Sequence, residues 1–276
     1  MTFKVATVTE RLAQTKQQLS VVMTGPFGIG KTSLVRGLNT DGTIIVDCEA
    51  GMLPVRDWPG RSVSIRRYLD FVDLTCLIGG VDPAATEAEP FSHAHHEYVR
   101  KLYRDLNLSG LDKYFVDSLS EVVRLSLIWA QNQPSSFSER TGKLDLRSAY
   151  GLMAKEVTRT LRHLQHAPGT VIFVCGLQRD PDNPGRWELQ LEGNKVGREL
   201  PFVADEVIAF DFFDWSEGSG WRHAPGTGEH RAFCCGSPNP WSLPAKDRSG
   251  RLDLIEEPHL GKLIAKILGN NGGQNA

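Results

Sequence analysis

The chain has 276 residues, 40% of them hydrophobic and 23% charged, with a formal net charge of −2 at pH 7, which is typical of a globular protein with a substantial core. This charge balance argues against a surface that binds nucleic acid throughout, so a contact with DNA would need a local basic patch. No apolar run is long enough to span a bilayer, and residues 1–18 are polar and mixed in charge, unlike a signal peptide, so we expect a cytoplasmic protein with no membrane contact.

Short apolar runs alternate with amphipathic segments along most of the chain. The predicted strands are 19–24, 43–47, 62–65, 114–117 and 171–176, and the predicted helices are 7–18, 31–39, 69–77, 94–107, 122–131 and 146–165. Strands that are apolar throughout and alternate with helices indicate a mostly parallel sheet covered by helices on both faces. We therefore predict an α/β fold, with surface loops at 79–92 and 132–144.

The pattern changes after about Asp214, where glycine, proline, tryptophan and two short strand-like segments dominate. A last amphipathic helix is predicted over 258–268, and the residues after it are rich in Gly and Asn. The expected organisation is an α/β core at 1–213, a β-rich extension with a terminal helix at 214–268, and a disordered tail at 269–276.

The strongest motif matches the pattern G-x-x-x-x-G-K-[ST] in full, between an apolar strand and a predicted helix. It consists of Gly25, Pro26, Phe27, Gly28, Ile29, Gly30, Lys31 and Thr32, and Ser33 follows it. In such a P-loop the backbone N–H groups surround the phosphates of a nucleotide, the lysine reaches the β- and γ-phosphates, and the hydroxyl of Thr32 binds Mg²⁺. No N/T-K-x-D guanine-recognition motif is present, which favours ATP over GTP as the nucleotide bound with Mg²⁺.

Asp117 ends the apolar segment Tyr-Phe-Val-Asp at 114–117. The carboxyl end of a parallel strand faces the ligand crevice of an α/β sheet. An aspartate at this position beside a P-loop is the expected Walker B residue, which helps to hold Mg²⁺. On its own, an apolar run that ends in Asp also fits a helix N-cap.

Two further polar residues follow predicted strands. Glu49 comes directly after the strand 43–47 and is the candidate that positions the water for hydrolysis, with Glu121 as the second choice. The alternative is a solvated acidic turn before Gly51. Gln178 follows the strand 171–176, where an uncharged amide could sense the γ-phosphate; the alternative is an ordinary loop glutamine.

Three other groups have a structural interpretation and a functional one. His93, His95 and His96 suggest a metal site or, with more support, an exposed helix start, because no matching set of Cys or carboxylate residues is evident. The odd number of cysteines argues against a disulfide framework, and the adjacent Cys234 and Cys235 lack the spacer of a zinc knuckle. The indoles of Trp215, Trp221 and Trp241 could stack on bases, although packing of the C-terminal strands is the simpler explanation.

The order of the motifs resembles the RecA-like ATPase core, and most closely the phage-type RecA-like ATPases proposed as single-strand annealing proteins. The segments involved are 25–32, 47–49, 114–118 and 171–178. The resemblance implies that Glu49 is the catalytic glutamate, that Asp117 is the Walker B aspartate and that Gln178 precedes the DNA-contacting segment. That segment, about 179–198, is locally basic through Arg179, Arg186, Lys195 and Arg198.

The resemblance extends to the stretch from Ala245 to Gly250, which contains Lys246 and Arg248. In related ring ATPases a K-x-R motif reaches the nucleotide of a neighbouring subunit, which implies a homo-oligomer whose Lys246 and Arg248 act in trans. Without the resemblance, these residues would indicate only a solvated turn. The stretch 79–100 contains no motif of the family.

Two other functions use the same P-loop. A small-molecule kinase would use 179–198 as a lid, but kinases of this group usually place the Walker B strand beside the P-loop strand, whereas here two strand-like segments intervene. A nucleotide-gated loader or assembly module with little turnover is the other alternative. The preferred interpretation is a DNA-dependent ATPase that acts on single-stranded DNA in recombination or annealing.

Overall fold

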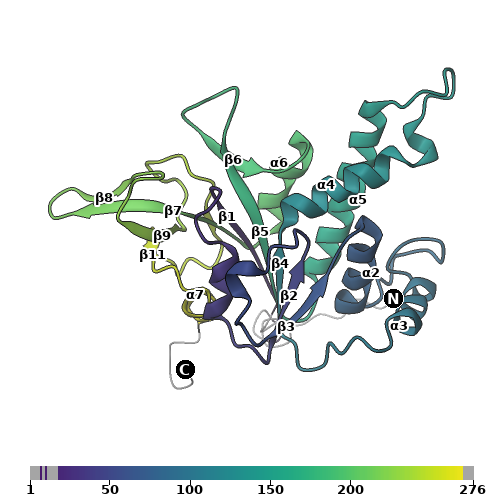
Figure 1. Cartoon of the computed structure of the whole chain (residues 1–276), viewed down its shortest axis with the longest axis horizontal. Helices are drawn as coiled ribbons and strands as arrows, with labels where there is room; N and C mark the ends of the chain where they lie inside the picture. The colour runs from purple at the N-terminus through teal and green to yellow at the C-terminus, as the bar shows by residue number, and fades with distance from the viewer. Residues whose placement is uncertain (1–6, 8–9, 11–17, 270–276) are drawn as a thin grey trace.

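The protein is described by a computed structural model that defines residue 7, residue 10 and residues 18–269. Most of the helix predicted over 7–18 and nearly all of the predicted tail lie outside the described residues. A single sheet runs through the molecule, with helices on both of its faces (Figure 1).

Six parallel strands form the centre of this sheet, in the order β7, β1, β5, β4, β2 and β3. Their bounds are β1 Leu19–Gly25, β2 Thr43–Asp47, β3 Arg61–Ser64, β4 Lys113–Asp117, β5 Thr170–Arg179 and β7 Glu206–Ser216. Every residue of β1 is buried, because β1 has a neighbouring strand at each side and a hydrophobic layer on each face. The predicted mostly parallel α/β sheet is confirmed.

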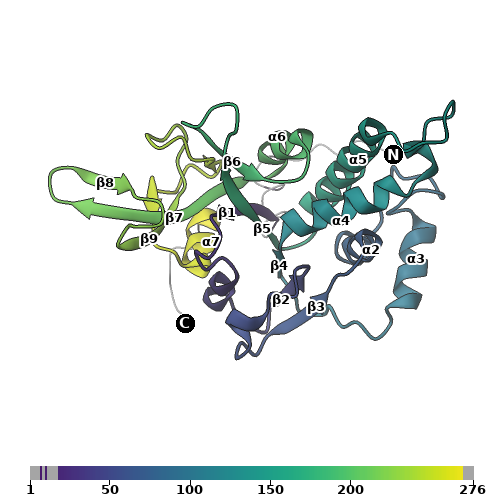
Figure 2. The same ribbon diagram turned by 45° about the horizontal axis from the view of Figure 1, so that its top comes forward.

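Two hydrophobic layers enclose the sheet. On one face lie α2 Tyr68–Gly79, α3 His93–Leu102, α4 Leu119–Gln131, α5 Leu146–Gln165 and α6 Asn194–Val203. Helix α5 buries Met153, Val157, Leu161 and Leu164, the apolar stripe expected from the helical spacing. The opposite face is covered by the short 3₁₀ helix η1 Thr32–Gly37 and by α7 Leu260–Leu268 (Figure 2).

The C-terminal residues continue the same sheet. Strands β9 His230–Cys234 and β11 Ile255–Glu256 extend it beyond β7, and β8 Gly220–His223 and β10 Lys246–Asp247 pair with β7. The expected boundary after residue 213 falls inside β7, and α7 shares its hydrophobic core with β1. Two of the tryptophans, Trp221 and Trp241, pack around Phe213.

The largest difference from the expected elements is in the segment 179–203. Strand β5 continues to Arg179 and pairs with the antiparallel strand β6 Trp187–Gln190, after which α6 begins. The segment expected to be a DNA-contacting loop is therefore a β-hairpin followed by a helix. No continuous apolar run marks β6, because a hairpin that projects from the sheet has little surface to bury.

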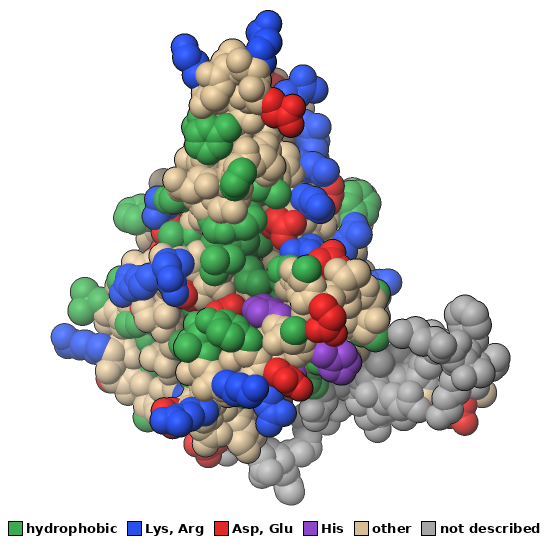
Figure 3. All heavy atoms as spheres, turned by 90° about the vertical axis from the view of Figure 1, so that its right-hand side faces the viewer, with side chains coloured by type: hydrophobic (Ala, Val, Ile, Leu, Met, Phe, Trp, Pro, Cys, Tyr) green, Lys and Arg blue, Asp and Glu red, His purple; other side chains and the backbone are tan. Residues whose placement is uncertain are grey.

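The connection between α4 and α5 also projects from the body of the molecule (Figures 1 and 3). It contains the 3₁₀ turn η3 Pro134–Ser136 and a bridge between Phe137 and Leu144, so the predicted loop has local order. All five cysteines are free and buried. Within the described residues, no helix is long and apolar enough to cross a membrane.

Candidate functional site

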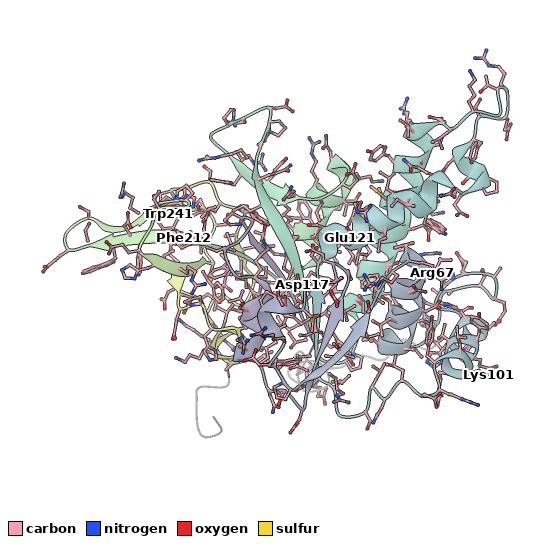
Figure 4. The ribbon with its side chains drawn as sticks, in the orientation of Figure 1. Arg67, Lys101, Asp117, Glu121, Phe212 and Trp241 are labelled. Carbon is pink, nitrogen blue, oxygen red and sulfur yellow. The ribbon has the colours of Figure 1, made fainter. Side chains whose placement is uncertain are left out.

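The carboxyl ends of β1, β2, β4 and β5 border a cleft of about 890 Å³. The predicted residues Lys31, Thr32, Glu49, Asp117 and Gln178 all line it, although they come from four different segments of the sequence. Figure 4 shows Asp117 near the centre of the molecule and Glu121 on the helix that follows it. Parallel strands bring these residues together because their carboxyl ends meet at one edge of the sheet.

The P-loop follows β1 and forms one wall of the cleft. Gly30 has φ of 103°, a conformation that strongly favours glycine. The ammonium of Lys31 donates hydrogen bonds to the carbonyls of Gly25 and Pro26, both at 2.9 Å. Burial lowers the pKa of Lys31, while Cys175, Asp117 and Glu49 oppose this shift. The lysine is thus a partly desolvated cation at the centre of the loop, and its hydrogen-bond partners among the described residues are carbonyl groups.

Thr32 and Asp117 form the predicted metal-binding pair. The Thr32 hydroxyl donates a hydrogen bond of 2.6 Å to Asp117 Oδ2, and Asp117 is only 8% exposed. Burial raises the pKa of Asp117 to about 6, and the nearby Glu49 adds to the increase. A hydroxyl and a carboxylate at contact distance are the hard oxygen donors that Mg²⁺ prefers, so these two residues fit that ion.

Glu49 lies beside Asp117, on the loop after β2. Its carboxylate accepts a hydrogen bond from the hydroxyl of Ser118. The same loop is fixed by two main-chain donors: Cys48 N–H donates to Asp117 O at 2.7 Å, and Gly51 N–H donates to Asp47 Oδ1 at 3.1 Å. The carboxylate of Glu49 is thereby held at the cleft.

Glu121, the second choice for the water-positioning residue, lines the same cleft from the first turn of α4. Its carboxylate forms a bidentate ion pair with Arg124, with distances of 2.5 and 2.7 Å. This partner neutralises its charge, and Glu49 has no such cation in an ion pair among the described residues. The geometry therefore favours Glu49.

Gln178 lies within β5, whereas the strand predicted over 171–176 ended two residues before it. Its side-chain amide donates a hydrogen bond of 2.8 Å to Glu188 on β6. Arg179, the next residue, stacks on Trp187 with its guanidinium carbon 3.8 Å from the ring centroid. Gln178 therefore links the cleft directly to the β5–β6 hairpin.

Lys246 and Arg248 lie outside the cleft of their own chain. Strand β10 pairs with the first residues of β7. These residues lie at the edge of the sheet where the parallel strands begin, opposite the P-loop. The Lys246 ammonium donates to the carbonyls of Pro201 and Ala204 at 2.9 and 2.6 Å. Arg248 forms a 3.1 Å ion pair with Asp205, and its side chain is 62% exposed.

The histidine cluster starts α3, as expected, after the N-cap Ser92. His95 contacts Asp73 at 3.1 Å and accepts a hydrogen bond from the N–H of Phe91. Within the described part of the chain, no three His, Cys, Asp or Glu side chains are grouped so as to hold a metal ion.

Two residues at the P-loop and the cleft were not predicted. Ser118 directly follows Asp117, so its position beside the predicted Walker B residue was a usable signal. Arg231 on β9 donates from Nη1 to the P-loop carbonyl of Ile29 at 3.3 Å. It is 202 residues from Ile29 in the sequence, and nothing in the local pattern around it indicates this contact.

Comparison with known proteins gives a family match. A family model described as AAA domain matches residues 17–249. No curated protein matches the sequence. Among solved structures, an ATPase from the type III secretion system of pathogenic bacteria matches 70% of this chain and 51% of that chain, with 15% sequence identity and a TM-score of 0.38. The present chain thus spans about half of that ATPase.

Proposed function

Since this chain belongs to the AAA domain family, whose members are ATPase domains, we propose that it is a Mg²⁺-dependent ATPase that acts on single-stranded DNA as a homo-oligomer, in recombination or annealing of the phage type. One observation supports this proposal above the others. Lys31, Thr32, Glu49, Asp117 and Gln178 line a single cleft at the carboxyl edge of the sheet.

The P-loop supplies the cation that neutralises the phosphates. In the proposed cycle, the Lys31 ammonium exchanges the carbonyls of Gly25 and Pro26 for β- and γ-phosphate oxygens. Thr32 and Asp117 would hold Mg²⁺, which when bound neutralises charge on the same oxygens. Because the cleft is partly desolvated, these interactions are stronger than they would be in water.

Glu49 is the proposed water-positioning residue. Its carboxylate would accept a hydrogen bond from the water that attacks the γ-phosphorus, as the bond to the β–γ bridging oxygen breaks and ADP leaves. The Ser118 hydroxyl orients this carboxylate, and the bonds around the loop restrict its movement. Ser118 is thus a positioning residue for the proposed hydrolysis.

The β5–β6 hairpin is the proposed contact with single-stranded DNA. Gln178 lines the nucleotide cleft and donates a hydrogen bond to Glu188 in the hairpin. Loss of the γ-phosphate would therefore alter the position of the hairpin through this side chain. Arg179 and Arg186 lie at the outer part of the hairpin, and Lys195 and Arg198 follow on α6. Four phosphate contacts would give a slope of about −3 in log K against log salt for a single strand.

The trans role of the K-x-R motif is also proposed. Arg248 is exposed at the edge of the sheet opposite its own cleft, a position from which it would complete the cleft of a neighbouring subunit. Lys246, bound to two carbonyls of its own chain, would hold the motif in place.

The kinase alternative has less support. Strand β5 separates the P-loop strand β1 from β4, which ends in Asp117, whereas the kinase group usually places these two strands side by side. The assembly-module alternative uses the same cleft and differs in having a slow rate of ATP hydrolysis.

Phosphate release from Mg·ATP, with and without single-stranded DNA, tests the proposal. We expect stimulation by DNA, and Glu49→Gln should bind ATP while its turnover falls roughly 10²-fold. Glu121→Gln is the matched control, because this carboxylate lies on the same cleft. A slow rate that DNA does not change would instead support the assembly module.

A further inference from the structure

A second cavity, of about 310 Å³, lies on the other side of the P-loop. It is lined by Gly30, Ser33 and Gly37 from the P-loop and η1, by Arg231 on β9, and by Pro258 and His259 before α7. Gly30 and Ser33 also line the nucleotide cleft. The two cavities therefore adjoin at the P-loop, and this one has a volume at the lower end of the range for small-molecule sites, about 300 Å³.

The direction of a bound triphosphate follows from the order of the strands. Glu49, Asp117 and Gln178 follow or end β2, β4 and β5, which all lie on one side of β1. A γ-phosphate beside these residues places the α-phosphate and the nucleoside toward the other side of β1. That side is formed by β7 and β9, where the second cavity lies.

The walls of this cavity are fixed by a close backbone contact. A Cβ on Gly261 would lie 2.3 Å from the carbonyl oxygen of Gly37, so only glycine allows α7 to approach η1 this closely. His259 caps α7, since its Nδ1 accepts a hydrogen bond from Lys262 N–H at 3.3 Å. The imidazole ring and the Pro258 ring are thus held beside the end of η1.

Arg231 is the one cation of the cavity without an ion pair among the described residues; the other, Arg36, pairs with Asp57. Among the described residues, a single N–H of Arg231 bonds, to Ile29 O, so the other donors of the guanidinium have no partner in this part of the chain. A planar cation next to rigid rings suits a flat aromatic base, because a guanidinium stacks on aromatic faces.

Resting on the proposed nucleotide site, we propose that this cavity binds the nucleoside of the nucleotide, with Arg231 against the base and the rings of Pro258 and His259 as its wall. The occupant is the base and ribose of the same ATP whose phosphates lie in the P-loop. Arg231 is then a specificity-determining residue for nucleosides over bare polyphosphate.

The test compares the binding of Mg·ATP with that of Mg·tripolyphosphate, which has the phosphates without a nucleoside. We expect Arg231→Ala to weaken ATP binding about tenfold and to leave tripolyphosphate binding within about twofold of the wild type. Arg231→Lys should recover little, because an ammonium lacks the planar surface. Arg222→Ala on β8, which removes an exposed arginine paired with Asp214, is the matched control and should change neither.

Equal weakening of both ligands would make Arg231 a phosphate contact and overturn the proposal, as would unchanged ATP binding. A second measurement is photolabelling with 8-azido-ATP, which should modify peptides that contain Arg231 or His259; labelling confined to other segments would contradict the assignment. Lys31→Ala tests the nucleotide site at the P-loop separately from the nucleoside site at Arg231. Loss of all ATP binding in this variant supports the P-loop site, whatever the effect of Arg231→Ala. Unaffected ATP binding in Lys31→Ala would instead refute the proposed function itself.

Discussion

The two edges of the central sheet use similar charged residues in different ways. At the carboxyl edge, Lys31 bonds to two carbonyls within the described part of the chain, and the polar groups around it line an open cleft. At the amino edge, Asp205 accepts three hydrogen bonds, two from Ser20 and one from Arg248. The first edge keeps groups available for a ligand, and the second satisfies them internally.

The amino edge is closed by β10 and the turn after it. Asp247 accepts hydrogen bonds from Ser249 Oγ, Gly250 N–H and Leu252 N–H. Glu206, only 1% exposed, accepts from the N–H groups of Arg248 and Ser249. A K-x-R pattern is therefore compatible with a structural role as well as with catalysis.

The largest effect is expected at the carboxyl edge. Lys31→Ala should lower turnover roughly 10³-fold or more, because the cation at the phosphates is lost. Its thermal midpoint should stay close to that of the wild type, since the partners of the ammonium in the residues that the structure describes are two carbonyls. Phosphate release and a melting curve on one preparation measure both; a large loss of stability with normal turnover would contradict the comparison.

Arg248→Ala tests whether the amino edge also serves a neighbour's site. We expect turnover to fall roughly 10²-fold while ATP binding and stability are retained, because an exposed ion pair contributes little to folding. Mixing this variant with Lys31→Ala protein should restore part of the activity if one intact site forms at a mixed interface. Full turnover of Arg248→Ala alone would show that the trans role is wrong.

Lys246→Met keeps the aliphatic stem and removes the ammonium from the carbonyls of Pro201 and Ala204. Leaving these half-buried groups without a donor should lower the free energy of unfolding by roughly 1–3 kcal/mol. Urea unfolding measures this, with Lys262→Met as the control, because that lysine is exposed and paired only with Glu257. Equal effects of the two substitutions would argue against the structural role.

Glu206 gives the smallest effect and a pH dependence. Burial raises the pKa of Glu206 from its ordinary value of 4.5 to about 7 in the folded chain, and Asp247 adds to the shift. The folded state therefore binds more protons than the unfolded state between these values, so stability falls as pH rises through this window. The free energy of unfolding of Glu206→Gln, measured relative to that of the wild type, should increase by roughly 1–2 kcal/mol from pH 5 to pH 8. If the difference in unfolding free energy between the two proteins were the same at pH 5 and pH 8, Glu206 would not contribute to the pH dependence of stability.

Much of the carboxyl edge was predictable from the sequence. The predicted strands 43–47 and 114–117 and the predicted helix 146–165 are continuous apolar or amphipathic segments, and the P-loop pattern is local, so their signals survive without tertiary information. Parallel topology then brings Asp117 and Glu49 to Lys31. The helix after the P-loop was predicted too long, because η1 ends at Gly37, where α7 approaches it.

The amino edge and the second cavity were not predictable in this way. The partners of Lys246 are 42 and 45 residues away in the sequence, and Arg231 contacts a carbonyl 202 residues away. Strand β7 contains the fully buried Asp211, whose polar side chain interrupts an apolar run and contacts His223 Nε2 at 2.8 Å. Such contacts depend on the folded arrangement and leave no periodic pattern.

The burial of every cysteine has a practical consequence for spectroscopy. Because all five thiols are enclosed, and burial raises the pKa of Cys175 to about 12, little reactive thiolate forms at neutral pH. A single cysteine introduced at the exposed Asn183, in the turn of the β5–β6 hairpin, would therefore be the preferred target of a maleimide dye. A fluorophore there would report hairpin movement during the nucleotide cycle in the otherwise native sequence.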